Sequence, residues 1–264
     1  DVDPATAETL KGARGVTLMG VQDLAYTLLG FNVSRAPFND PLVREAINYA
    51  IDREELIDAV YFGNAVEGGP LSPGLVQWAT PVSNFPCYAS NPDKARELLA
   101  KAGYPNGFDA GLLTFGTIQV VSDAAQVLQA QLAEVGVRLA INVAEFGAFV
   151  QAWRNSDFDT FVSLNGGATD PDGYLYRTFV TGGSTNVYKF SDPAVDELLQ
   201  LGRTTTDRTE RVNIYDHLQK RLACNGPIAH VAYGTLFSAV SDQVTGFKQL
   251  PTRGLRYLRE VELH

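Results

Sequence analysis

A loop rich in glycine and acidic residues, from Asn165 to Tyr174, carries the groups of this chain best suited to binding a small molecule. It follows a predicted strand at 158–164, and in open α/β sheets ligands lie beyond the carboxyl ends of strands. Its glycines leave backbone N–H groups unshielded, so they can donate to a carboxylate, phosphate or hydroxyl. We therefore predict that this loop forms the wall of a cleft. The candidate ligand-binding residues are Asn165, Gly166, Gly167, Ala168, Thr169, Asp170, Asp172 and Tyr174.

Two carboxylates of this loop, Asp170 and Asp172, flank Pro171 and allow two interpretations. In the first they begin a helix: Asp170 caps it, Pro171 takes the first helical position, and the helix dipole stabilises Asp172. In the second, one of them is the general acid or base of a hydrolase. Hydrolytic carboxylate pairs stand on facing elements several ångströms apart, and neighbours on one turn do not provide that geometry. We favour the cap and keep the enzyme as the alternative.

A second candidate segment lies between a predicted strand at 110–115 and a predicted helix at 121–134. Thr117 and Gln119 can offer hydrogen bonds to a ligand, although capping the following helix is the simpler role for Thr117. The candidate residues of this segment are Phe115, Gly116, Thr117 and Gln119.

The remaining polar side chains give weaker signals. Tyr233 and Arg253 are added as ligand-binding candidates, although such a tyrosine is more often core and a lone arginine more often solvated. The three histidines, His217, His230 and His264, have no partner at a fixed spacing, and no hydrolase, metalloprotease, phosphate-loop or dinucleotide motif is present. We therefore expect no catalytic residue, no metal and no cofactor.

The chain has two cysteines, Cys87 and Cys224, neither of which stands in a C-x-x-C or Cys/His ligand spacing. One disulfide in an oxidising compartment and two buried free thiols both fit this pattern. We favour the disulfide, which would close a long loop and constrain the unfolded chain.

The periodicity of apolar residues predicts the mixed α/β framework that positions these loops. The predicted strands are 16–19, 24–31, 110–115, 137–143, 158–164, 228–233 and 236–240. The predicted helices are a pair within 39–61, and 91–99, 121–134, 146–153, 193–202 and 207–223. The strands at 110–115 and 137–143 flank a helix, so they should run parallel. The Gly- and Pro-rich segment 63–78 should be a surface excursion.

The helix pair is the most specific signature in the sequence. Asp40 and Pro41 begin the first helix, and Asp52 with Glu55 forms a capping box for the second. The sequence from Gly30 to Tyr61 resembles the family 5 extracellular solute-binding proteins of ABC importers. In that family a strand ending in G-F-N precedes the motif D-x-x-V-R-x-A-[IL]-x-Y-A-I-[DN]-[RK]. Similar matches are D-P-x-K-A-x-x-L-L, here at 91–99 with Asn91 in the first position, and V-x-G-F, here at 244–247.

The resemblance implies the C-terminal lobe of a periplasmic-binding-protein-like type II fold, with a mixed sheet flanked by helices. Residues 33–226 would form the ligand-binding lobe. Residues 1–32 and 227–264 would belong to the interlobe sheet and to two crossing segments, near 24–32 and 228–240, that serve as the hinge. Family members are longer, so the N-terminal lobe is expected to be missing from this chain.

The family binds peptides, nickel chelates, opines, glutathione or oligosaccharides, and the resemblance implies a small polar solute as ligand and an ABC permease as partner. Where peptide binders carry a tryptophan, this chain has Asn165, and the aspartate that pairs with a peptide amine falls on Ala168 or Gly167. An unpaired buried ammonium is costly. We therefore expect free peptides to bind poorly unless the other lobe supplies a counter-charge.

Composition agrees with a secreted binding protein. The chain has 264 residues and a formal net charge of −9, and it lacks the basic clusters that nucleic acids require. No apolar stretch is long enough to span a bilayer. The first residue is Asp1 and no secretory signal precedes it, so we expect a trimmed, periplasmic or extracellular, monomeric protein. A complete single-lobe interaction module is a third interpretation; in that case the apolar faces of the strands near 24–31 and 228–240 would be covered within the chain.

Overall fold

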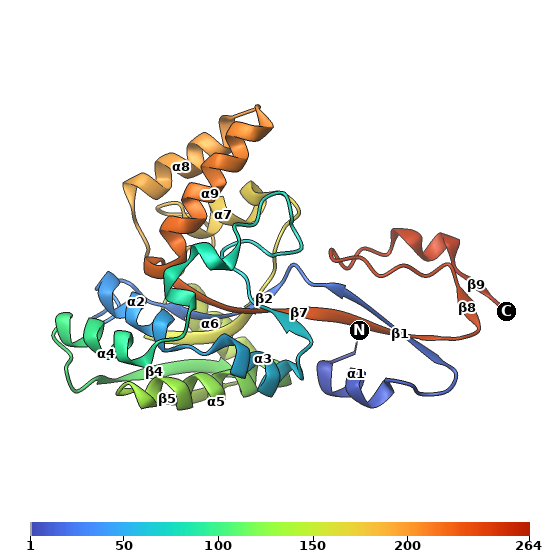
Figure 1. The fold of residues 1–264 in the computed structure, drawn as a ribbon, viewed down its shortest axis with the longest axis horizontal. Coiled ribbons are helices and arrows are strands. Elements are labelled where there is room, and N and C mark those ends of the chain that lie inside the picture. Colours follow the sequence, from blue (N-terminus) through green and yellow to red (C-terminus); the bar gives the residue numbers. More distant parts are fainter. Residues whose placement is uncertain (1) are drawn as a thin grey trace.

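The computed structural model describes residues 2–264, so the predicted first segment is described except for its first residue. One seven-stranded sheet runs through the molecule in the order β1-β7-β2-β6-β4-β5, with β3 paired to β7. Figure 1 shows helices α4 and α5 beside the strands of one end of this sheet, α7, α8 and α9 grouped above it, and a long ribbon of β1 and β7 projecting from the body.

The elements have the following bounds. The strands are β1 Val16–Gln22, β2 Tyr26–Phe31, β3 Ala65–Val66, β4 Phe108–Phe115, β5 Val137–Ala144, β6 Thr160–Asn165, β7 Ile228–Ser241, β8 Val244–Thr245 and β9 Glu262–Leu263. The α-helices are α1 Pro4–Leu10, α2 Pro41–Ala50, α3 Arg53–Tyr61, α4 Pro92–Lys101, α5 Gln119–Glu134, α6 Phe146–Asn155, α7 Pro171–Phe179, α8 Pro193–Thr204 and α9 Arg208–Asn225. The 3₁₀ helices are η1 Val82–Asn84, η2 Pro86–Tyr88 and η3 Arg256–Glu260.

The helix pair forms as its caps predict. The Asp40 carboxylate accepts from the backbone N–H of Leu42 at 2.8 Å, and that of Asp52 accepts from Glu55 at 2.9 Å. The sheet is mixed: β4 runs parallel to both β5 and β6, whereas β2 runs antiparallel to β6 and β7. The predictions of a mixed sheet flanked by helices and of parallel β4 and β5 are therefore confirmed.

The strand at the second crossing is longer than predicted. Two strands, at 228–233 and 236–240, were expected, but β7 is one continuous strand of 14 residues. It pairs with β2 along its first half and with β1 along its second half, so its partner changes while its own backbone stays extended. Gly234 does not break the strand; a Cβ there would lie 2.8 Å from the ring of Tyr61, so the glycine makes room for that side chain.

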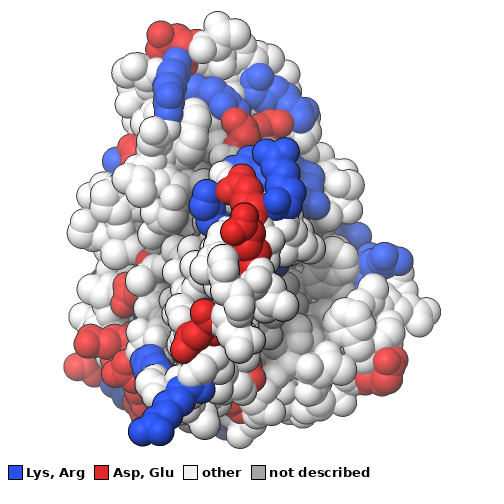
Figure 2. Space-filling view, turned by 90° about the vertical axis from the view of Figure 1, so that its right-hand side faces the viewer, with Lys and Arg blue, Asp and Glu red and all other residues white. Residues whose placement is uncertain are grey.

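The two halves of this crossing differ in burial. All residues of β2 and the first six residues of β7 are buried, whereas no residue of β1 is fully buried. In Figure 1, β1 and the outer half of β7 leave the body together with α1 and the C-terminal segment. Figure 2 looks at this end of the molecule, where Lys and Arg side chains lie beside Asp and Glu in the upper half and much of the rest is uncharged.

The segment 63–78 reaches the surface at both ends, as its glycines and prolines suggested, and Val76 is 85% exposed, but its centre does not. Residues 68–72 are buried. Side chains at Gly68 and Gly69 would collide with the rings of Tyr233 and Phe85, at 2.5 and 2.4 Å from a Cβ atom. The glycines therefore allow two aromatic rings to pack directly on the backbone, a role that local turn preferences do not reveal.

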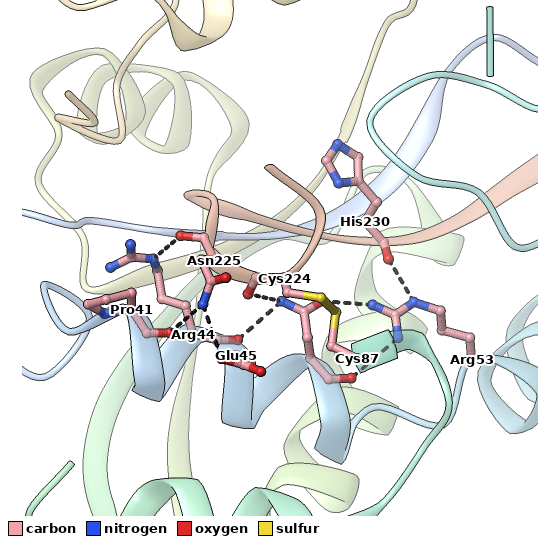
Figure 3. The surroundings of a disulfide bond; sticks show 9 residues. Pro41, Arg44, Glu45, Arg53, Cys87, Cys224, Asn225 and His230 are labelled. Carbon is pink, nitrogen blue, oxygen red and sulfur yellow. Dashed lines mark hydrogen bonds between the residues drawn. A yellow bond between two sulfur atoms is a disulfide. The ribbon is translucent and has the colours of Figure 1, made fainter. Parts of the chain in front are cut away.

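The predicted disulfide is confirmed: Cys87 in η2 is bonded to Cys224 near the end of α9 (Figure 3). Two buried arginines lie beside it. Arg44 donates to the backbone oxygen of Asn225, and burial lowers its pKa to about 10. Arg53 donates to the backbone oxygen of His230 at 2.9 Å. These contacts join the helix pair to the start of the second crossing. Within residues 2–264, no helix has the length and apolarity needed to cross a membrane.

Candidate ligand-binding site

The glycine-rich loop packs directly on the first crossing. It leaves β6 at Asn165, whose side-chain amide donates to the hydroxyl of Tyr26 at 3.2 Å. A Cβ atom at Gly167 would lie 2.3 Å from the carbonyl oxygen of Leu24, whereas one at Gly166 would meet nothing within 4 Å. The backbone of Gly167 therefore packs against Leu24, just before β2, although Gly167, like Gly166 and Thr169, is exposed to solvent.

A hollow of about 260 Å³ lies where the two crossings meet the carboxyl ends of β4 and β6. The first crossing contributes Asp23 and the second contributes Thr235. Ile118 follows β4, Leu164 is in β6, and Arg253 comes from the C-terminal segment. Strand ends and crossings from four parts of the sequence thus converge on one space, which is the arrangement expected for a ligand site in an open α/β sheet.

The hollow contains an ion pair. A nitrogen of the Arg253 guanidinium lies 2.5 Å from one carboxylate oxygen of Asp23, and the other oxygen accepts from the N–H of Ala25 at 3.0 Å. Asp23 is only 8% exposed, and Ser72 donates to its backbone oxygen. Arg253 was predicted as a candidate, whereas Asp23 was missed; its only signal is a carboxylate immediately before a buried strand.

A second hollow, of about 430 Å³, is lined by Thr169 of the glycine-rich loop. Thr169 and Leu24 line one side of it and Leu75 another. Residues 250–252 and 254–256 of the C-terminal segment close it, so the predicted candidate Thr169 faces this space.

Asp170 and Asp172 begin α7, as the cap interpretation predicted. Asp170 accepts from the N–H of Asp172 at 2.9 Å, and Pro171 occupies the first turn. Arg211 donates to both oxygens of Asp170 at 2.8 and 2.7 Å, and this contact lowers the pKa of Asp170. Arg203 pairs with Asp172 at 3.1 Å. Both carboxylates are thus paired with arginines of α8 and α9. These ion pairs hold the start of α7, the helix that follows the loop, against α8 and α9.

The segment after β4 differs from the prediction in its cap. Phe115 is buried, and Gly116, Thr117 and Gln119 are exposed. Thr117 does not cap α5: Ile118 occupies the N-cap position, and no side chain bonds the first N–H groups there. The turn places Thr117 one residue before the cap, while the apolar Ile118, which was not a candidate, reaches the hollow.

Two tyrosines that were predicted as ligand-binding candidates are buried beneath the loop. Tyr174 and Tyr233 are both buried against Tyr26, with ring centroids 5.6 and 5.3 Å away. The hydroxyl of Tyr233 donates to the backbone oxygen of Gly69 at 2.7 Å. His230 packs on the ring of Tyr26, with ring centroids 5.0 Å apart. Burial, together with the charge of nearby Arg53, lowers the pKa of His230 to about 3. A cavity of only about 10 Å³ remains between the loop and these rings; it is bordered by Gly167, Ala168, Tyr26, Tyr174 and Tyr233. The region beneath the loop is therefore tightly packed.

Comparisons with known proteins match this chain to one family. Residues 1–186 match the family described as "Bacterial extracellular solute-binding proteins, family 5 Middle". The glutathione-binding protein GsiB of Pectobacterium atrosepticum is 30% identical over 93% of this chain and 49% of its own length. Heme-binding protein A of Haemophilus influenzae is 28% identical over 89% of this chain and 44% of its own.

A solved relative shows the same architecture. The structure of AgaA from A. tumefaciens R10 in complex with agropinic acid superposes with a TM-score of 0.83 at 28% identity, covering all of this chain and 55% of that one. The chain thus spans about half the length of the relatives it matches. The family consists of binding proteins, so the alternative of a hydrolase using Asp170 or Asp172 is not supported. This chain belongs to the family 5 bacterial extracellular solute-binding proteins.

Proposed function

We propose that this chain is the C-terminal, ligand-binding lobe of a periplasmic or extracellular receptor that captures a small polar solute for an ABC importer. Capture requires no chemistry. A second lobe would close over the hollow at the crossings, bury the solute and present the closed form to a permease. Closure is favoured only by contacts that the solute makes better in the closed state.

The observation that carries this proposal is the convergence on one hollow of Asp23, Ile118, Leu164 and Thr235, which belong to both crossings and to two strand ends. A closing lobe must pivot about the crossings, so a solute bound beside them touches both lobes at once. The ion pair of Asp23 and Arg253 gives this space polar groups that can orient a solute.

The division of the chain is part of the same proposal. We assign residues 33–226 to the lobe and residues 1–32 and 227–264 to the crossings and the interlobe sheet. The strand β2 and most of β7 are covered within the chain, as a complete single-lobe module requires. The observation that supports the two-lobe assignment is β1, which pairs with the outer half of β7 and has no buried residue. A lobe of this kind alone would bind its solute weakly, because half of the contacts come from its partner.

The predicted poor binding of free peptides remains part of the proposal. Ala168 offers no carboxylate to a peptide amine, and Asp23, the buried carboxylate of the hollow, is already paired with Arg253. A free ammonium would therefore have to compete with a guanidinium for Asp23, unless the second lobe provides another anion.

The test is to fill the hollow. In the full-length receptor, Leu164→Trp should reduce the amount of solute retained through purification at least about tenfold, because the indole occupies the space between the crossings. Leu201→Trp is the matched control, since Leu201 is 44% exposed on α8. Mass spectrometry of the purified proteins measures retained solute. Equal retention by the two variants would exclude this hollow as the site.

A further inference from the structure

A second cleft, of about 420 Å³, lies between the start of α3 and the 3₁₀ helices η1 and η2. It shares no lining residue with the hollow at the crossings. Three carboxylates line it, those of Asp52, Glu54 and Glu67, and its single cation is Arg53. The lining residues therefore carry a net charge of −2 at neutral pH, and anionic ligands are repelled.

Arg53 does not neutralise these carboxylates through hydrogen bonds. Its guanidinium is buried, donating to the backbone oxygen of His230 at 2.9 Å and to the side-chain oxygen of Asn48 at 2.8 Å. Figure 3 shows it turned toward β7 and the disulfide. Asp52 is engaged as the cap of α3, where it accepts from Glu55. Arg53 thus lines the cleft and contributes positive charge to it, but it forms no ion pair with the three carboxylates.

Glu67 is the unpaired group of the cleft. It is half-buried, and among residues 2–264 it has neither an ion-pair partner nor a hydrogen-bond partner for its side chain. Burial raises its pKa, and the charges of Asp52 and Glu54 act in the same direction, while Arg53 opposes them. Withdrawing a carboxylate partly from water without an ion-pair contact costs free energy that a bound cation would offset.

Tyr88 adds an independent, uncharged acceptor. It lines the same cleft and is 5% exposed, yet its hydroxyl has no hydrogen-bond partner in the described part of the chain. Arg53 lies over the face of its ring, 3.7 Å from the centroid, and both its charge and its contact with the hydroxyl lower the Tyr88 pKa, against the effect of burial. Burial raises the Tyr88 pKa to about 12, and the nearby Glu67 charge acts in the same direction. The ring of Phe85 lies 5.1 Å from that of Tyr88.

We propose that this cleft binds an alkylammonium group, with the ammonium between Glu67 and the Tyr88 hydroxyl and the carbon chain against Phe85. An ammonium has three donors, which suit a carboxylate and a hydroxyl oxygen, and aromatic walls favour an attached alkyl chain. A metal ion fits less well, because among residues 2–264 no three His, Cys, Asp or Glu side chains converge to hold one. The group can come from a free amine or from a lysine side chain of a partner protein.

The experiment is a calorimetric titration of the whole chain with three probes: 1,5-diaminopentane as a free amine, Nα-acetyl-lysine methylamide as a lysine side chain, and pentanol as an uncharged control. We expect saturable binding of one or both amines and none of the alcohol. Tighter binding of the lysine derivative would identify a protein partner, and tighter binding of the diamine a free ligand. Affinity should fall as the pH is lowered through the raised pKa of Glu67.

Glu67→Gln should weaken amine binding at least about tenfold, because it keeps the shape of the side chain and removes its charge. Glu197→Gln, on the exposed face of α8, makes the same change in net charge and should leave affinity unaltered. Unfolding midpoints of both variants check that each is folded. The absence of saturable binding up to about 10 mM amine, or equal affinity of Glu67→Gln and the unmodified chain, would overturn the proposal.

Discussion

Substituting alanine for Gly167 tests whether the glycine-rich loop packs directly on the backbone of Leu24. A Cβ atom there would lie 2.3 Å from the carbonyl oxygen of Leu24, so the loop and the first crossing must separate by about 0.7 Å to reach even a 3.0 Å contact. Gly167 is not among the glycines with positive φ, so packing alone opposes alanine. We expect Gly167→Ala to lower the free energy of unfolding by about 1–3 kcal/mol.

The neighbouring glycine is the matched control. A Cβ at Gly166 would meet nothing within 4 Å, so Gly166→Ala should change stability little, or raise it by up to about 1 kcal/mol by restricting the unfolded chain. Urea unfolding followed by circular dichroism measures both variants. If their free energies of unfolding agree within about 0.5 kcal/mol, the loop does not rest on Leu24 and the described geometry of the site is wrong.

Three further predictions concern stability. Replacing Cys87 and Cys224 with alanine removes a link across 137 residues and should cost about 3–5 kcal/mol in urea unfolding without reductant; a loss below about 1 kcal/mol would contradict this. Asp170→Asn should cost about 1 kcal/mol near neutral pH; because the pKa of Asp170 is lowered in the folded state, this cost should shrink as the pH falls below the ordinary carboxyl range and through the lowered pKa, and a cost that does not change with pH would count against the ion pair. The pKa of His230 falls to about 3 on folding, so the unfolded chain takes up the proton first and stability should drop between about pH 6.5 and 3; a pH-stability curve unchanged by His230→Gln would refute this.

Local signals in the sequence were sufficient for much of the framework. The caps at Asp40, Asp52 and Asp170 act within three residues, so their helices were predicted near their observed starts. The parallel pairing of β4 and β5 followed from the helix between them. Such features depend on neighbours in the chain, and these are visible without a structure.

The features that were missed depend on distant partners. β7 remains one strand because β1 and β2 pair with it in succession, and Gly68 and Gly69 are buried because the Tyr233 and Phe85 rings cover them. Asp23 became a candidate residue only through its contact with Arg253, which lies 230 positions away. Composition and periodicity carry no information on such pairings, so the contents of the hollow required the three-dimensional arrangement.

Native mass spectrometry of the full-length receptor, purified without unfolding, tests the central claim most directly. A receptor that buries a solute between its lobes should appear with one additional, constant mass that is lost when the protein is denatured and restored by adding the released solute. If only the unliganded mass appears, both after purification and after incubation with opines, glycosides, glutathione and peptides, the proposal of a solute-capturing receptor would be contradicted.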